Sequence, residues 1–231
     1  MKINGKNLTR QQLAGMFDHT NLHADASAAD MKKLCDEARE NSFAMVAVNS
    51  VQTELCKSFL AGTKVHVGAA ISFPLGQTAM AVKVFETEHA IKDGADEIDY
   101  VVNLTEVKNG NWEYIREEME RIVSVCRKAG VISKVIFENC YLTDDEKVQL
   151  ARIASEVKPD FIKTSTGFST GGATAEDVRL MKETVGADVS VKAAGGIRSW
   201  DACRTMLEAG ATRIGTSSSL KILKEFEEAD Q

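Results

Sequence analysis

Two lysines, each near the end of a short apolar segment, are the residues in this sequence best suited to chemistry. Lys163 lies in "DFIKTS" and Lys192 lies in "DVSVKAA". A lysine is a nucleophile only as the free amine, and at the usual pKa of about 10.4 roughly one in 2,500 is neutral at pH 7. Burial and a second ammonium group nearby both lower that pKa. The pair therefore predicts a Schiff-base nucleophile if the fold buries both side chains together.

The alternation of side chains along these segments indicates which way the charged groups point. In "DEIDYVV", Asp99 alternates with Ile98 and Tyr100, and Lys163 and Lys192 alternate with apolar neighbours in the same way. The apolar faces can pack against helices, so we expect the three charged side chains to point away from the helices, into the barrel that these strands would form. An interior ion network without chemistry would use the same three residues, because structural networks also perturb pKa values.

Eight segments with the composition of strands recur along the chain, with helical periodicity between them. Several helical stretches close on glycine, as in "KDGA" and "RKAG". This alternation predicts a single (β/α)8 barrel domain over residues 1–231, with an extra helix at 8–17 and a doubly wound open sheet as the alternative. The strand segments are 16–20, 43–48, 64–72, 95–102, 133–139, 160–165, 188–194 and 212–217, and the clearest helical stretches are 28–42, 78–95, 111–130 and 200–211.

Glycines and serines follow the seventh and eighth strand segments. Gly195 and Gly196 lie in "AAGGIRS", while Ser217 and Ser218 lie in "GTSSSLK", where the last helix begins. In this fold the corresponding loops often hold phosphate through backbone N–H groups and a helix N-terminus. An ordinary turn and helix cap would use similar residues. The joint position of the two loops, beside the predicted lysines, favours a phosphate site.

The composition narrows the function classes. The 231 residues are 44% hydrophobic and 27% charged, with a formal net charge of -6, which argues against nucleic acid or an anionic membrane as the main partner. The absence of an apolar leader or a membrane-length run predicts a cytoplasmic protein. The five cysteines form no CxxC pair and the four histidines show no metal-ligand spacing, so we expect no disulfide, metal or other cofactor.

The motifs together resemble the deoxyribose-phosphate aldolases, a family of class I, Schiff-base-forming aldolases. The resemblance runs from Asp18 to Ser218 and is most specific where "FIKTSTGF" is followed by "VKAAGGIRS". The other matching pieces, in the same order as in the family, are "DHTNL", "SFPLG", "GADEIDYVVN", "KVIFEN" and "RIGTSS".

The resemblance implies specific roles for residues of this chain. It makes Lys163 the nucleophile that forms the imine, Lys192 its pKa-lowering partner and proton carrier, and Asp99 a member of the proton relay. Polar residues around the substrate hydroxyls would be Asp18, Thr20 and Thr164. The phosphate-binding segments would contain Gly167, Gly195, Gly196, Gly215, Ser217 and Ser218.

The implied reaction is the reversible cleavage of 2-deoxyribose 5-phosphate to glyceraldehyde 3-phosphate and acetaldehyde, without a cofactor. A homodimer is expected from the resemblance alone. Another class I aldolase, a transaldolase-like enzyme or a non-catalytic phosphosugar-binding protein remain alternatives. The chain departs from the common family pattern at Ala47, Ser50, Ser72 and Asn139, and it lacks the C-terminal tyrosine of some members.

Overall fold

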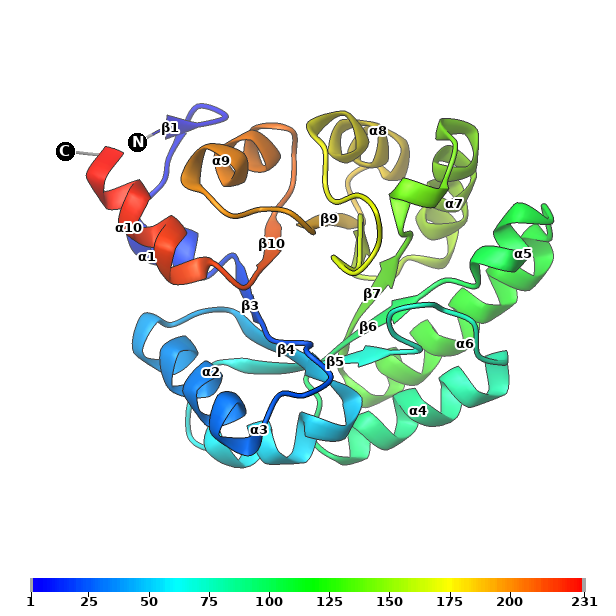
Figure 1. Ribbon diagram of the computed structural model, residues 1–231. Coiled ribbons are helices and arrows are strands. Elements are labelled where there is room, and N and C mark those ends of the chain that lie inside the picture. Colours follow the sequence, from blue (N-terminus) through cyan, green and yellow to red (C-terminus); the bar gives the residue numbers. More distant parts are fainter. Residues whose placement is uncertain (1, 230–231) are drawn as a thin grey trace.

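The computed structural model describes residues 2–229, apart from the side chains of Lys2 and Lys6. Within these residues, eight strands pair in parallel and close into a barrel, with helices around it (Figure 1). The order around the barrel follows the sequence, and the last strand pairs with the first. The strands are β3 (Phe17–Thr20), β4 (Met45–Asn49), β5 (His66–Ile71), β6 (Glu97–Val101), β7 (Ile132–Ile136), β8 (Phe161–Lys163), β9 (Ser190–Ala194) and β10 (Arg213–Thr216).

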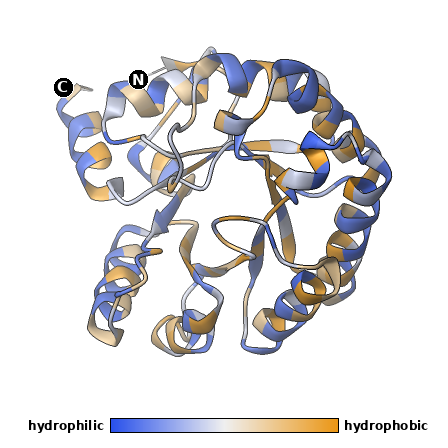
Figure 2. Ribbon diagram, turned by 45° about the vertical axis from the view of Figure 1, so that its right-hand side comes forward, coloured by the Kyte–Doolittle hydropathy of each residue, from blue (hydrophilic) through white to orange (hydrophobic). Residues whose placement is uncertain are grey.

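The helices between the strands have a polar side and an apolar side, while the barrel strands are largely apolar (Figure 2). Two 3-10 turns, η1 (Ser50–Gln52) and η2 (Asn139–Tyr141), follow β4 and β7. The helices are α1 (Arg10–Ala14), α2 (Ala28–Asn41), α3 (Thr53–Phe59), α4 (Met80–Lys92), α5 (Leu104–Lys108), α6 (Trp112–Ala129), α7 (Asp144–Val157), α8 (Ala175–Val185), α9 (Trp200–Glu208) and α10 (Ser219–Ala229).

The predicted (β/α)8 barrel is therefore confirmed, and each predicted strand segment overlaps one barrel strand, although β4 ends one residue later and β7 begins one residue earlier than predicted. The extra N-terminal helix exists but is shorter than 8–17, since it begins after Thr9 and the chain enters β3 at Phe17. The small antiparallel pair of β1 (Lys2–Ile3) and β2 (Lys6–Asn7) has no counterpart in the sequence prediction. Helix α1 packs beside α10, which brings the two ends of the chain together (Figure 1).

Local sequence explains where several helices begin and end. Thr9, Ser27 and Thr143 each accept a hydrogen bond from the third helical residue, whose side chain accepts one in return from the cap backbone. This reciprocal cap satisfies N–H groups that a helix start would otherwise leave without partners. Gly130 ends α6 in the left-handed region, at φ 70°, where a glycine meets no Cβ penalty.

Among the described residues, no helix is both long and apolar enough to cross a membrane. The five cysteines are free thiols, and only Cys140 is exposed. These observations leave the predicted cytoplasmic location as an expectation.

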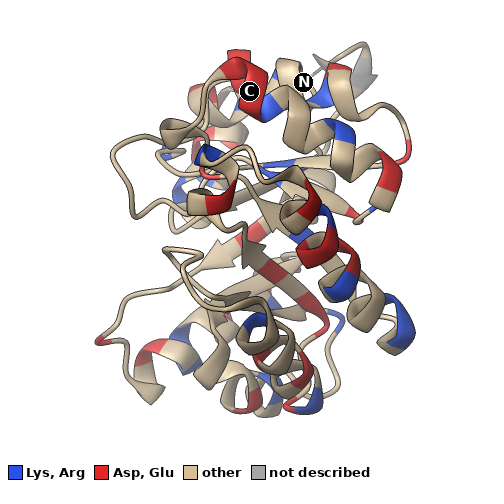
Figure 3. Cartoon of the chain, turned by 90° about the vertical axis from the view of Figure 1, so that its right-hand side faces the viewer, with Lys and Arg blue, Asp and Glu red and all other residues tan. Residues whose placement is uncertain are grey.

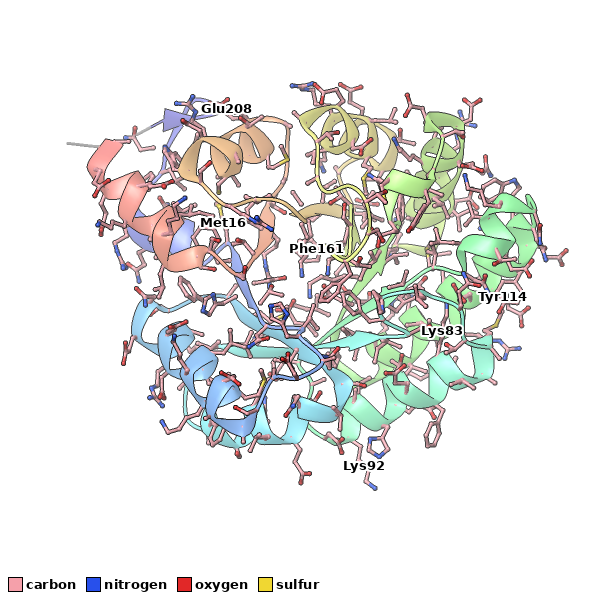
Figure 4. The ribbon with its side chains drawn as sticks, in the orientation of Figure 1. Met16, Lys83, Lys92, Tyr114, Phe161 and Glu208 are labelled. Atoms are coloured by element: carbon pink, nitrogen blue, oxygen red, sulfur yellow. The ribbon has the colours of Figure 1, made fainter. Side chains whose placement is uncertain are left out.

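A buried ion pair on the outside of the barrel secures the end of β6. Lys83 of α4 lies 2.8 Å from Glu118 of α6, and both side chains are fully buried. Lys83 also donates to the Val101 carbonyl at 2.7 Å, while Glu118 accepts from the Asn103 N–H at 3.1 Å. In Figure 4, Lys92 projects from α4 to the outside of the molecule, whereas Lys83 lies on the inner side of the helix.

We expect Lys83→Met to destabilise the protein strongly, because it leaves the Glu118 carboxylate buried without its cation. The free energy of unfolding should fall by about 3–5 kcal/mol, measured by urea denaturation. Lys92→Met, on the exposed side of the same helix, should change it by less than about 0.5 kcal/mol. Equal effects of the two substitutions would contradict this account, as would a Lys83→Met/Glu118→Leu double variant no more stable than Lys83→Met alone.

Candidate active site

Lys163, Lys192 and Asp99 meet inside the barrel. Strands β8 and β9 are neighbours, and Lys163 and Lys192 lie opposite one another in their register. The Asp99 Oδ2 atom accepts hydrogen bonds from the Lys163 Nζ atom at 3.0 Å and the Lys192 Nζ atom at 2.6 Å. The three residues are 4%, 0% and 3% exposed, respectively. The predicted inward direction of these side chains is thus confirmed.

The network extends around the barrel to four further charged residues. Figure 3 shows bands of charged residues on the barrel strands. Lys134 donates to Asp99 Oδ1 at 2.7 Å and lies 2.5 Å from Glu97. Arg213 donates to Asp18 and to Glu97, and Lys192 forms a second ion pair with Asp18. The interior carboxylates are Asp18, Glu97 and Asp99, and the basic groups paired with them are Lys134, Lys163, Lys192 and Arg213.

The balance of charge in this network makes Lys163 the group most readily neutralised. Three carboxylates face three other basic groups, so a protonated Lys163 adds an uncompensated charge in a buried site. Burial, followed by the charge on Lys192, lowers the pKa of Lys163 to about 8, although Asp99 opposes the change. Roughly one Lys163 in ten is then a free amine at pH 7, compared with one in 2,500 for an ordinary lysine.

Two neighbours of Lys163, Asp99 and Lys134, keep their charged forms. Burial would raise the pKa of Asp99, but Lys134, Lys192 and Lys163 together hold it well below its usual value. Burial would lower the pKa of Lys134, but Asp99 and Glu97 raise it instead. At neutral pH, Asp99 is therefore a carboxylate and Lys134 an ammonium group, while the lowered pKa of Lys163 makes its free amine more accessible.

A pocket of about 230 Å³ opens over Lys163 at the carboxyl ends of the strands. Arg198 and His23 also line its wall, and no carboxylate of the described residues lines it. This arrangement suits an anionic ligand with a group that can reach Lys163. The predicted substrate and phosphate residues that line the pocket are Thr20, Gly167, Gly195, Gly196, Gly215 and Ser217.

The other predicted residues lie outside the pocket wall. Asp99, Lys192 and Asp18 belong to the buried network below it, and Ser218 lines a neighbouring groove. The Thr164 hydroxyl donates to the Ala194 carbonyl at 3.1 Å and accepts from the Ala194 N–H at 3.2 Å. The Thr164 side chain therefore joins β8 to β9 in this structure.

The glycine loops after β8 and β9 pack backbone against backbone. A Cβ atom on Gly172 would lie 2.3 Å from the Gly195 carbonyl oxygen, and Ala173 donates its N–H to the same oxygen at 3.0 Å. Gly195 itself has φ 90°, a conformation that side chains rarely adopt. At least two of these glycines are thus needed for the close approach of the loops, whatever ligand lies above them.

Several residues of the site were not predicted from the sequence. The Phe73 ring centroid lies 6.0 Å from the Lys163 Nζ atom, and the Phe168 ring packs edge-on against Phe73 at 5.3 Å. The motif "SFPLG" contributes to the family resemblance, but nothing in its pattern indicates where the Phe73 side chain lies. Lys134, in contrast, has the same parity in "SKVIFEN" as the inward residues and pairs in register with Asp99, so the alternation argument could have found it.

Among the described residues, no group of three or more histidine, cysteine, aspartate or glutamate side chains is arranged to hold a metal ion. The four histidines are separate. His19 contacts Glu37, His66 contacts Glu97 and His89 contacts Asp93, while His23 lines the pocket.

Comparison of the sequence with known proteins identifies the family. The sequence model described as DeoC/LacD family aldolase matches residues 13–225. The chain belongs to this aldolase family. It is 58% identical over 214 residues to the deoxyribose-phosphate aldolase of Lactobacillus acidophilus, covering 93% of this chain and 90% of that one. The deoxyribose-phosphate aldolase of Thermococcus gammatolerans is 49% identical over 92% of this chain and 95% of its own length.

Solved structures give the same result for this aldolase. A crystal structure titled as a putative deoxyribose-phosphate aldolase from Coccidioides immitis superposes with a TM-score of 0.91 at 33% identity, covering 95% of this chain and 87% of that one. A deoxyribose phosphate aldolase from Aeropyrum pernix, whose title describes a unique tetrameric structure, superposes with a TM-score of 0.88 at 30% identity, covering 96% and 93% of the two chains.

The charge network predicts opposite shifts of the Lys163 pKa in two variants of this aldolase. Lys192→Met removes a repelling charge and should raise the pKa, whereas Asp99→Asn removes an attracting charge and should lower it. Only the free amine attacks an aldehyde, so the rate of acetaldehyde trapping by cyanoborohydride should rise with pH through a midpoint near 8 in the parent protein. The midpoint should move up in Lys192→Met and down in Asp99→Asn.

Lys92→Met serves as the control for this titration, since an exposed lysine on α4 should leave the midpoint unchanged. Shifts in the same direction for Lys192→Met and Asp99→Asn, in proteins with native circular dichroism, would rule out electrostatic tuning of Lys163 by these two groups.

Proposed function

We propose that this aldolase cleaves 2-deoxyribose 5-phosphate to glyceraldehyde 3-phosphate and acetaldehyde, with Lys163 as the Schiff-base nucleophile. The observation that carries the proposal is the buried Lys163 amine, with its lowered pKa, beneath a pocket that glycines, a serine and Arg198 line. The names of the relatives support the choice of substrate.

The first step is formation of the imine. The neutral Lys163 amine attacks the C1 aldehyde of the open-chain sugar, which gives a carbinolamine, and loss of water gives a protonated imine. The new cation stays in the buried site beside the Asp99 carboxylate, which lies 3.0 Å from the Lys163 Nζ atom. A carboxylate already in place stabilises this charge without reorganisation of solvent.

The second step breaks the bond between C2 and C3. Removal of the proton from the C3 hydroxyl lets its oxygen form the aldehyde of glyceraldehyde 3-phosphate, while the electrons of the C2–C3 bond pass to the protonated imine and give an enamine. We assign the proton relay to Asp99 and Lys192, acting through water, because Lys192 lies 2.6 Å from Asp99 and close to the nucleophile in register.

The final step returns the free amine. A proton added to C2 of the enamine regenerates the imine, now of acetaldehyde, and water hydrolyses it to acetaldehyde and the Lys163 amine. Phe73 provides an apolar surface beside the Lys163 Nζ atom, at 6.0 Å from ring centroid to nitrogen. Such a surface limits the access of bulk water to the reacting atoms.

We assign the phosphate to the far end of the pocket, where the loops after β9 and β10 meet. Gly195, Gly196 and Ser217 line this part, and α10 begins two residues after Ser217. Backbone N–H groups and the start of a helix favour an anion there, and Arg198 adds a positive charge. Gly167, Gly215 and Ser218 complete the predicted phosphate residues.

Asp18, Thr20 and Thr164 remain the predicted contacts to the substrate hydroxyls, with only Thr20 on the pocket wall. The homodimer and the single domain over residues 1–231 also remain predictions for this protein.

Acetaldehyde with borohydride should leave a stable two-carbon adduct on Lys163 and on no other buried lysine. Peptide mapping by mass spectrometry locates the adduct, and Lys163→Ala should lose both the adduct and the cleavage of 2-deoxyribose 5-phosphate. Adduct formation on Lys192 or Lys134 in place of Lys163 would overturn the assignment of the nucleophile. Comparison with fructose phosphates separates this activity from that of other class I aldolases.

Lys192→Ala and Lys192→Leu should each lower kcat by roughly 100- to 10,000-fold, since both remove a proton carrier and a charge that lowers the pKa of Lys163. Steady-state cleavage of 2-deoxyribose 5-phosphate measures the effect, and circular dichroism checks that the barrel is retained. Folded variants with near-normal kcat at pH 7 would refute the role given to Lys192.

A further inference from the structure

Glu138 is a buried carboxylate that faces a loop of the pocket. It lies two residues after Ile136, the last residue of barrel strand β7, and its side chain is fully buried. Among the side chains that the structure describes, no lysine, arginine or histidine forms an ion pair with it. A buried carboxylate needs hydrogen bonds to replace those it made with water.

The loop between β8 and α8 provides these hydrogen bonds. Glu138 accepts from the Thr166 N–H at 3.0 Å, from the Thr166 hydroxyl and from the Ser169 hydroxyl at 2.9 Å. The Thr166 hydroxyl oxygen in turn accepts from the Phe168 N–H at 3.1 Å. Residues 166–169 are thus fixed to one carboxylate from a neighbouring strand.

The backbone at Glu138 is strained in a way that points to a need for this side chain. Its φ of 56° and ψ of 61° lie in the left-handed region, which glycine adopts freely and glutamate rarely does. Such strain persists only where the surrounding structure fixes it, and it clusters at functional sites.

The loop that Glu138 holds contributes directly to the pocket. Thr166, Gly167 and Phe168 all line the pocket over Lys163. At its other end, the loop is tied to the β9 loop, because Ala173 donates to the Gly195 carbonyl at 3.0 Å. Between these two attachments, Gly167 lies beside Gly195, whose Cβ position would be 3.5 Å from the Gly167 Cα atom.

We propose that Glu138 is a positioning residue, which holds the loop of residues 166–169 in the shape that the phosphate end of the pocket requires. The inference rests on the proposed function, since it assumes that Gly167 and Gly195 bind the phosphate of the substrate. Glu138 is not among the residues that line the pocket, so its loss weakens recognition of the phosphate and spares imine formation.

Glu138→Ala and Glu138→Gln test this role with two substrates, 2-deoxyribose 5-phosphate and unphosphorylated 2-deoxyribose. Glu138→Ala should raise KM for the phosphorylated sugar. The ratio of kcat/KM for the phosphorylated sugar to kcat/KM for the unphosphorylated sugar should fall by about tenfold or more. Glu138→Gln should fall between the parent and Glu138→Ala, because its amide oxygen can still accept from the Thr166 N–H while its NH₂ group cannot accept a hydroxyl proton. An unchanged ratio in folded Glu138→Ala would overturn the proposal.

Glu118→Gln is the matched control, because it also neutralises a buried carboxylate that accepts a backbone N–H, but on the outer helix α6. It should lower stability and leave the ratio within about twofold of the parent value. Trapping of acetaldehyde at Lys163 should likewise persist in Glu138→Ala, and its loss would contradict a role confined to the phosphate loop.

Thr166→Val removes one hydroxyl partner of Glu138 and gives an independent measure of the same contact. If Glu138 acts through this loop, the effects of Thr166→Val and Glu138→Ala on the ratio should be less than additive in the double variant. Fully additive effects of the two substitutions would contradict the proposal that Glu138 acts through its hydrogen bond with Thr166.

Affinity for inorganic phosphate, measured by calorimetry, separates failure of this inference from failure of the proposed function. A parent protein that binds phosphate and cleaves neither sugar would refute the proposed function. The role of Glu138 would then be tested by the phosphate affinity alone, compared between the parent and Glu138→Ala. We expect about tenfold weaker binding in Glu138→Ala. Equal affinity in the parent and in Glu138→Ala would overturn the positioning role.

Discussion

The Asp99 carboxylate, which accepts hydrogen bonds from three lysines, is the interaction on which the site depends. Without it, Lys134, Lys163 and Lys192 would place three ammonium groups in one buried space, a state that their mutual repulsion and lost hydration oppose. With it, Lys134 stays an ammonium group, while the pKa of Lys163 is lowered to about 8. Asp99 therefore stabilises the cluster, and because the three interior carboxylates face four basic groups, protonated Lys163 is the one charge without compensation.

The glycine loops form a second constraint, above the charged network. The β8 and β9 loops approach so closely that a Cβ atom on Gly172 would overlap the Gly195 carbonyl oxygen. Loops in such contact cannot be adjusted independently, so their shape depends on what fixes their ends. Glu138 fixes one end of the β8 loop from a strained backbone position, and the Ala173 hydrogen bond fixes the other. The glycine-lined part of the pocket and the barrel beneath it are thus one connected structure.

The inward direction of the charged side chains followed from local sequence because side-chain parity is a local property. Alternation about Ile98 and Tyr100 placed Asp99 on the inner face, and the same argument placed Lys163 and Lys192 there. The same alternation in "SKVIFEN" places Lys134 on the inner face as well. Phe73 and Phe168 gave no such signal, since both lie in loops after strands, where no periodicity indicates a direction. Their contact depends on the path of two separate loops over the barrel.

The sequence by itself determined the alternation of strands and helices, the inward face of each charged strand residue and, through its motifs, the family. These properties depend on spacings of a few residues, for which backbone geometry leaves little choice. Only the tertiary structure decided which charges meet. Asp99 and Lys192 are separated by more than ninety residues in the chain and by 2.6 Å in space. Closure of the barrel sets that distance, and with it the number of cations around each carboxylate, the pKa of Lys163 and the contact of Glu138 with a loop it does not adjoin in sequence.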